Sequence, residues 1–76
     1  MIPEPRYDVM SGGRYLAVAV PKNEALRIAC DGTRGKTVTI QGKVLPAIAT
    51  VYGAWPYCDP VAMFEGGKEV SFPRGV

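Results

Sequence analysis

Short stretches of alternating apolar and polar residues run along much of this chain. Period-two alternation of this kind is typical of β-strands that bury one face. Residues 14–20 and 37–40 show it most clearly, and both stretches are rich in the β-branched and aromatic residues that strands favour. We therefore predict a strand in each. The first should end at Pro21, which has no N–H to donate to a neighbouring strand.

A glycine marks the turn after the second of these strands. Gly42 is free to take the positive φ of a tight hairpin turn, so residues 44–52 are predicted to return beside the preceding strand. Pro46 restricts that return strand to a sheet edge or to a start just beyond the proline. Ile48 and Val51 share one face only if a bulge or the strand end lies between them, because they are three positions apart.

A second hairpin is indicated near the C-terminus. Gly66 and Gly67 lie between residues 61–64 and 69–72, and two adjacent glycines between apolar runs are a typical hairpin signal. Together, the alternating stretches define the expected core. Its predicted members are Leu16, Val18, Val20, Val38, Ile40, Ile48 and Val51.

One segment, residues 23–31, matches two patterns. As a helix, it would begin with Asn23 as N-cap and stop at Gly32. As a strand, alternate residues from Leu26 to Cys30 would share one face. We interpret the segment as a strand, because it is short for a helix and strands are predicted on both sides of it.

Glycine and proline make up about a fifth of the 76 residues and leave little room for long helices. The predicted fold is therefore all-β, a small barrel or compact sandwich of five or six short strands. The whole chain, residues 1–76, is expected to be a single small domain with its β core at residues 13–72. A chain of this size buries a limited apolar area, so it commonly needs a partner or a cross-link for stability.

The two ends are expected to form extended arms, residues 1–12 and 73–76, because their prolines fix φ and stiffen the backbone. At least one end, residues 1–7 or 72–76, is predicted to lie against another protein chain. A stiff segment loses less entropy than a flexible one when a partner orders it. The alternative is that both ends fold back and close the domain itself.

Charge and cysteine content add a compartment prediction. The net charge is only +2, and the sequence shows neither a leader pattern nor an apolar run long enough for a membrane span. We expect a soluble protein made in the cytoplasm, with an incorporation into virus particles as one context. Cys30 and Cys58 should then be reduced thiols, although a disulfide between them would stabilise so small a domain.

The sequence lacks the residue sets that carry common catalytic chemistry. It contains no His, and its two cysteines are too few and too far apart for a zinc site. Gly35-Lys36-Thr37 resembles the end of a phosphate-binding loop, but Cys30 occupies the position where that motif requires its first glycine. We therefore predict a protein that is not an enzyme and that uses no cofactor or metal.

Residues 52–60 are the most distinctive segment, because they hold three of the seven aromatic residues together with two prolines. Rigid aromatic side chains in a loop suit a binding surface. The alternative is that Trp55 folds inward and covers one end of the core. The predicted partner interface combines this segment with apolar residues of the two ends: Ile2, Tyr7, Tyr52, Trp55, Tyr57, Phe72 and Val76.

Three functions remain open on this sequence. The favoured one is a structural or interaction subunit that docks onto a larger protein assembly or onto copies of itself, for example a viral capsid-stabilising (decoration) or connector protein. A second is a small nucleic-acid-binding barrel, and a third is an inhibitor of a host enzyme or complex. The nucleic-acid alternative depends on four basic residues that fall close together in sequence: Arg27, Arg34, Lys36 and Lys43.

Overall fold

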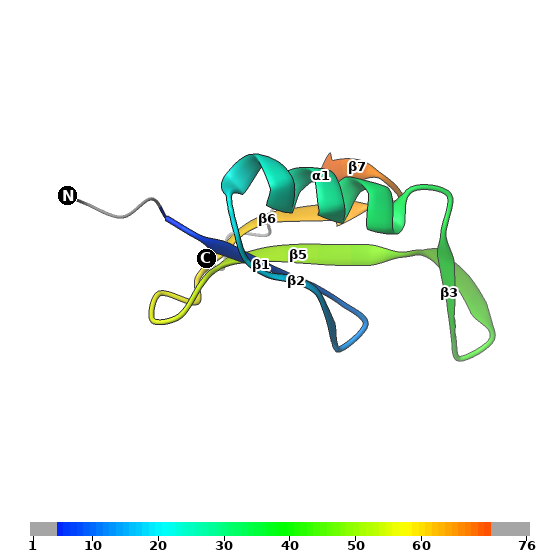
Figure 1. Cartoon of the computed structure of the whole chain (residues 1–76). Coiled ribbons are helices and arrows are strands. Elements are labelled where there is room, and N and C mark those ends of the chain that lie inside the picture. Colours follow the sequence, from blue (N-terminus) through cyan, green and yellow to red (C-terminus); the bar gives the residue numbers. More distant parts are fainter. Residues whose placement is uncertain (1–4, 71–76) are drawn as a thin grey trace.

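The chain folds as an open antiparallel sheet with one helix on it, as a computed structural model that describes residues 5–70 shows (Figure 1). The elements in chain order are β1 (Tyr7–Ser11), β2 (Arg14–Val20), α1 (Lys22–Thr33), β3 (Thr37–Ile40), β4 (Lys43–Pro46), β5 (Ile48–Gly53), β6 (Pro60–Glu65) and β7 (Lys68–Val70). Five strands form a sheet in the order β2-β1-β5-β6-β7, and β3 and β4 form a separate hairpin. The fold is thus mostly β, but the expected all-β barrel is wrong, because the sheet does not close and a helix is present.

Tight two-residue turns connect three pairs of strands. Gln41 and Gly42 link β3 to β4, and both have positive φ (51° and 80°), as the turns that match the twist of a hairpin require. Gly66 and Gly67 link β6 to β7 in the same way. Both turns were predicted from the sequence and are confirmed. The return strand expected at residues 44–52 is wrong beyond Pro46, because β4 ends there and β5 belongs to the five-stranded sheet.

A third hairpin was not predicted. Gly12 and Gly13 join β1 to β2, and β1 then pairs on its other side with β5. Residues 7–11 therefore form an inner strand of the sheet rather than part of an extended arm. The N-terminal arm expected at residues 1–12 is wrong over this range. Residues 1–4 and 71–76, and with them the rest of both arms, lie outside the described residues.

The strand expected at residues 23–31 is also wrong, because this segment lies in α1. Pro21 occupies the N-cap position, and its carbonyl group accepts the first helical hydrogen bond from the N–H of Ala25 (2.9 Å). Ala25, Ala29 and Thr33 are buried, and their spacing of four places them on one helix face. Leu26, Ile28 and Cys30 pack half-buried beside this face, and because they also alternate along the chain, the sequence matched a strand as well as a helix.

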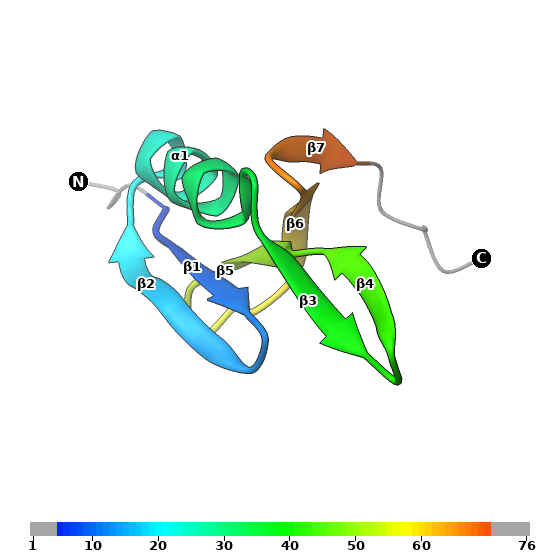
Figure 2. The same ribbon diagram turned by 90° about the vertical axis from the view of Figure 1, so that its right-hand side faces the viewer.

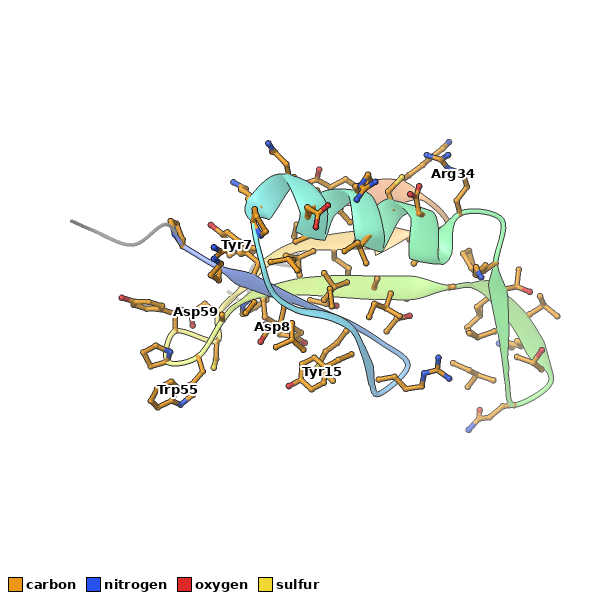
Figure 3. The ribbon with its side chains drawn as sticks, viewed as in Figure 1. Tyr7, Asp8, Tyr15, Arg34, Trp55 and Asp59 are labelled. Atoms are coloured by element: carbon orange, nitrogen blue, oxygen red, sulfur yellow. The ribbon has the colours of Figure 1, made fainter. Side chains whose placement is uncertain are left out.

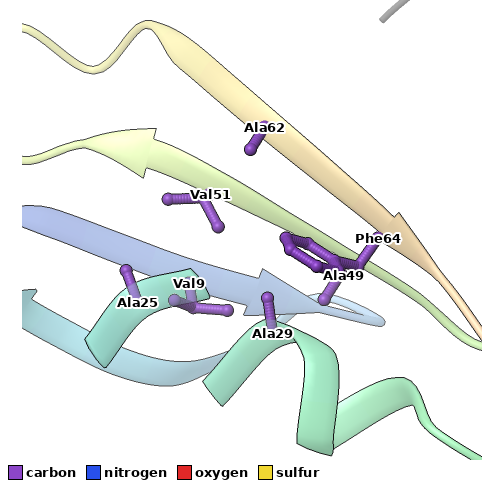
Figure 4. Packing of buried hydrophobic residues seen from close by; sticks show 7 residues of the cluster. All are labelled: Val9, Ala25, Ala29, Ala49, Val51, Ala62 and Phe64. Carbon is purple, nitrogen blue, oxygen red and sulfur yellow. The ribbon is translucent and has the colours of Figure 1, made fainter. Parts of the chain in front are cut away.

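The core lies between α1 and one face of the sheet (Figure 4). Seven side chains form it, and four of them are alanines: Val9, Ala25, Ala29, Ala49, Val51, Ala62 and Phe64. Small side chains on both surfaces let the helix backbone approach the sheet closely. Gly32 contributes to this close approach, because a Cβ atom there would lie 2.7 Å from Cδ1 of Leu16.

Most of the predicted core is wrong. Val51 is fully buried and Val20 is half-buried, whereas Leu16, Val18, Val38, Ile40 and Ile48 are 36–61% exposed. Alternation identified two faces of each strand but not the one that α1 covers. In β5, the buried face carries Ala49 and Val51, so Ile48 points the other way and no bulge separates it from Val51. The hairpin of β3 and β4 extends away from the sheet, and no second layer from the described part of the chain covers either of its faces (Figure 2).

Candidate protein-binding surface

The sheet face opposite α1 is built from one residue of each strand. The register places Met10 beside Tyr15 and Thr50, and Met63 beside Thr50 and Val70. Met10, Thr50 and Met63 are immediate neighbours along their strands of buried core residues, so they point to the other side of the sheet, and Tyr15 and Val70 pair with them in register. We call this the open face. Four of its five side chains are apolar or aromatic; Tyr15 is 61% exposed and the other four residues are half-buried.

The five residues form a central row across the strands, and the parallel rows of residues on either side of it extend the open face. Ile48 is exposed and lies opposite Glu65, which in turn lies opposite Lys68. On the other side of the central row, Tyr52 lies opposite Asp8. Figure 3 shows Asp8 and Tyr15 on the side of the sheet that faces away from α1. The open face therefore continues over most of the sheet and is largely apolar.

The charged groups of the open face lie beside polar or oppositely charged groups of the same chain. The carboxylate of Asp8 accepts a hydrogen bond from the N–H of Ala19 (2.8 Å). Glu65 and Lys68, of opposite charge, are direct cross-strand neighbours. These arrangements lower the cost of removing water from the face when a partner covers it.

Residues 54–59, which we call the aromatic turn, lie at one end of this face. Trp55 is 83% exposed and Tyr57 is 76% exposed, so the expectation that Trp55 might cover the core is wrong. Three main-chain hydrogen bonds hold the turn: Gly53 N–H to Asp59 C=O (2.8 Å), Ala54 N–H to Arg6 C=O (2.9 Å) and Tyr57 N–H to Ala54 C=O (3.0 Å). The two large side chains are therefore presented on a fixed backbone.

Residues 37–46, the hairpin of β3 and β4, lie at the other end, and we call them the hairpin arm. Every residue of both strands is exposed. The register places Val38, Ile40, Leu45 and Lys43 on one face of the arm. Three of these four are apolar, and nothing in the described residues covers them. An isolated two-stranded hairpin is marginally stable in water, so this arm gains most from a partner.

The aromatic turn and the hairpin arm flank the open face. They are attached to opposite ends of β5, and both extend to the side of the sheet away from α1 (Figures 1 and 3). The hydrogen bond from Ala47 N–H to Lys36 C=O (3.0 Å) closes the base of the arm. Open face, turn and arm thus form one continuous exposed surface.

Only some of the predicted interface residues lie on this surface. Tyr52, Trp55 and Tyr57 come together at its aromatic end. Tyr7 lies on the other side, half-buried against the core beneath α1 (Figure 3). Ile2, Phe72 and Val76 lie outside the described residues. Sequence reasoning missed Met10, Tyr15, Thr50, Met63 and Val70; the alternation of residues 7–11 before two adjacent glycines was the signal that could have found the first of them.

The four basic residues that were predicted to contact a polyanion do not form one patch. Arg27 is paired on the helix with Glu24 (2.7 Å), whereas Lys36 and Lys43 lie at the base and tip of the hairpin arm. Arg34 follows the helix and lies 3.9 Å from Asp31. No aromatic residue lies among them in the arm, so the stacking platform of a single-strand binder is missing there.

Arg34, just after α1, contacts Cys30 on the helix. Its guanidinium group donates a hydrogen bond to Sγ of Cys30 (3.2 Å), and the thiol of Cys30 donates to the carbonyl of Gly67 (3.2 Å). Chiefly this hydrogen bond, with the charge of Asp31 as a lesser cause, raises the pKa of Arg34 above its ordinary value. These contacts fasten the end of α1 to the β6–β7 turn. Both cysteines, Cys30 and the exposed Cys58, are free.

A depression of about 340 Å³ lies beside the start of α1, lined by Pro5, Tyr7, Pro21, Lys22 and Asn23, without an acid–base pair. Within residues 5–70 there is no cluster of acidic, Cys or His side chains suited to a metal ion. Across the same range, no helix has the length and hydrophobicity needed to cross a membrane.

Comparison with known proteins adds no relative: no protein-family model, curated protein or solved structure matches this chain.

Proposed function

We propose that the protein is a non-enzymatic interaction subunit that binds protein through its open face, the aromatic turn and the hairpin arm. One observation carries this proposal. Within residues 5–70, α1 covers the sheet on one face only, and the other face is largely apolar and adjoins the two most exposed aromatic side chains, Trp55 and Tyr57.

Layer packing supports the proposal. A sheet with two apolar faces needs a layer on each, and this chain supplies one helix for one of them. Large contiguous apolar patches are rare on monomeric soluble proteins and mark interaction sites. Trp and Tyr are the residues most enriched among those that dominate binding energy at interfaces. Stabilisation of an assembly, as by a capsid-decorating or connector subunit, is one role that such a surface would serve.

Position-specific photo-cross-linking tests the proposal. A photoreactive phenylalanine analogue replaces Tyr15 on the open face or Tyr57 in the aromatic turn, with Asn23 on the exposed start of α1 as the matched control. The chain is produced in its natural source and irradiated there. We expect cross-links to protein from the first two positions and none, or far fewer, from Asn23.

Two results would contradict the proposal. One is an equal yield of protein cross-links at all three positions, since the open side would then be no more a binding surface than the helix. The other is cross-linking of Tyr15 and Tyr57 to nucleic acid, which would favour the nucleic-acid-binding function instead.

A further inference from the structure

We infer that the partner on the open face is a second copy of this chain, packed face to face about a two-fold axis so that each hairpin arm lies against the aromatic turn of the other copy. This inference rests on the proposed function, because it names the occupant of the same surface. Two sheets would then form a sandwich between subunits, with a helix on each outer side.

The centre of the open face suits self-association. A two-fold axis brings each group of one copy close to the same region of its partner, so an unpaired charge near the axis would meet its own kind. The central row, from Tyr15 through Thr50 to Val70, carries no charge. Of the charges beside it, Asp8 accepts a hydrogen bond from the N–H of Ala19, and Glu65 lies in register opposite Lys68, which has the opposite charge.

The charges at the two ends select the orientation. The arm and its base carry Lys36 and Lys43 and no acidic residue, whereas Asp59 is the one charge of the aromatic turn, which Arg6 borders. If the strands of the two copies ran in the same direction, arm would meet arm and lysine would meet lysine. If they run in opposite directions, each arm meets an aromatic turn, which brings Lys43 toward Asp59. The second arrangement avoids the like-charge repulsion of the first.

The apolar groups at these ends match as well. The arm offers the face of Val38, Ile40 and Leu45, and the turn offers Trp55 and Tyr57. Lysine side chains beside exposed aromatic rings add a cation–π attraction. The aliphatic side chains and lysines of the arm therefore complement the aromatic rings of the turn.

The area of the sheet alone would not hold such a dimer. Five strands spaced about 4.8 Å apart, with six-residue strands about 20 Å long, give a flat footprint of roughly 500 Å². A stable interface commonly buries about 800 Å² on each partner. The arm and the turn must therefore contribute, and changes at these ends should weaken the dimer.

A charge exchange tests the arrangement. Lys43→Asp places two acids against each other at both ends of the dimer, and Asp59→Lys places two lysines there. We expect each variant alone to dimerise at least about tenfold more weakly than the unaltered chain, as measured by sedimentation over a series of concentrations. Mixing the two variants should restore dimerisation, because both contacts of the mixed dimer join an acid to a lysine. Native mass spectrometry should then find the mixed dimer in excess of either homodimer.

A centre-of-face variant provides the second test. Thr50→Arg puts a cation next to its own copy at the middle of the face and should give a monomer of about 8.2 kDa that remains folded, as judged by circular dichroism. Asn23→Arg, on the exposed start of α1, is the control and should remain a dimer. A monomeric unaltered chain, a dimer indifferent to Thr50→Arg, or mixed variants that stay as weak as each alone would overturn the inference.

These outcomes separate the inference from the proposed function. A chain that is monomeric in solution, but whose Tyr15 position cross-links to a different protein, would refute the homodimer and leave the interaction function standing. A monomer without position-specific cross-links would refute both.

Discussion

At the scale of single residues, Thr33 is the one buried polar side chain of the described chain, and its hydroxyl group joins α1 to the β6–β7 turn. It donates to the carbonyl of Ala29 (2.9 Å) and accepts from the N–H of Gly67 (2.9 Å). Thr33→Val keeps the shape but leaves the Gly67 N–H without a partner, so we expect a loss of about 1–3 kcal/mol in the free energy of unfolding. Urea denaturation measures this loss. Thr39→Val, at an exposed site in β3, should change it by less than about 0.5 kcal/mol. Equal effects of the two substitutions would show that the buried hydrogen bonds contribute nothing.

The neighbouring Gly67 provides a second residue-scale prediction. Its φ is +88°, and a Cβ atom there would lie 3.0 Å from Cα of Arg34. Gly13 has a similar φ of +78° but nothing within 4 Å of a Cβ atom. Both Gly→Ala substitutions pay for the positive φ, about 1–2 kcal/mol. Only Gly67→Ala also pushes against the backbone of Arg34, so chemical denaturation should find it the more destabilising by about 1 kcal/mol or more. A Gly13→Ala variant that is the weaker of the two would refute this account of the contact.

At the scale of elements, two of the three hairpins could be predicted from the sequence, whereas the helix matched a strand pattern equally well. Adjacent residues able to take positive φ define the turns at Gly42 and Gly66 locally, without reference to the rest of the fold. The buried face of α1 consists of Ala25, Ala29 and Thr33, and the larger apolar residues beside it also alternate as they would in a strand. Which face of each strand is buried depends on where that helix lies. Because a strand was predicted in place of the helix, the wrong faces of the other strands were assigned to the core. For the same reason, the open face was not predicted as a candidate site.

The alanine contact between α1 and the sheet yields an element-scale prediction. Ala29→Leu adds volume where the helix and sheet backbones are close, and overpacking of this kind costs about 1–3 kcal/mol. For a domain of this size, each kcal/mol lowers the melting temperature by about 4–8 °C. Asn23→Leu, on the exposed start of the same helix, is the control and should leave the melting temperature nearly unchanged. An unchanged melting temperature for Ala29→Leu would mean that the helix does not pack as closely as described.

At the scale of the whole molecule, the residues that form the core and the residues proposed to bind a partner lie on opposite sides of the sheet. All of the fully apolar burial lies between α1 and one side of the sheet, whereas the aromatic turn and hairpin arm contribute exposed surface. Exposure is a property of the assembled chain, which is why the sequence could single out Trp55 and Tyr57 but could not decide whether they point inward. For the same reason, the sequence could not decide whether Tyr7 belongs to the core or to a partner interface, because an apolar side chain suits both.

Removal of the hairpin arm tests this separation. Lys36 and Ala47 are already joined by a main-chain hydrogen bond, so two glycines can replace residues 37–46 and close a tight turn. We expect the melting temperature to change by only a few degrees, because no arm side chain belongs to the core. Self-association, measured by sedimentation, should be lost. A large fall in melting temperature would show instead that the arm stabilises its own domain.

The pairing of β1 with β5 has a consequence for the time course of synthesis. The two strands are neighbours in the sheet, yet roughly forty residues separate them along the chain. At about 5–20 residues added per second, β5 emerges from the ribosome several seconds after the β1–β2 hairpin, which forms within microseconds. Throughout that interval the inner edge of β1 has unpaired N–H and C=O groups, and α1 has only a partial surface on which to pack. Nascent chains on neighbouring ribosomes of one messenger would present the same edge to one another, so slow translation before β5 should favour mispairing between chains.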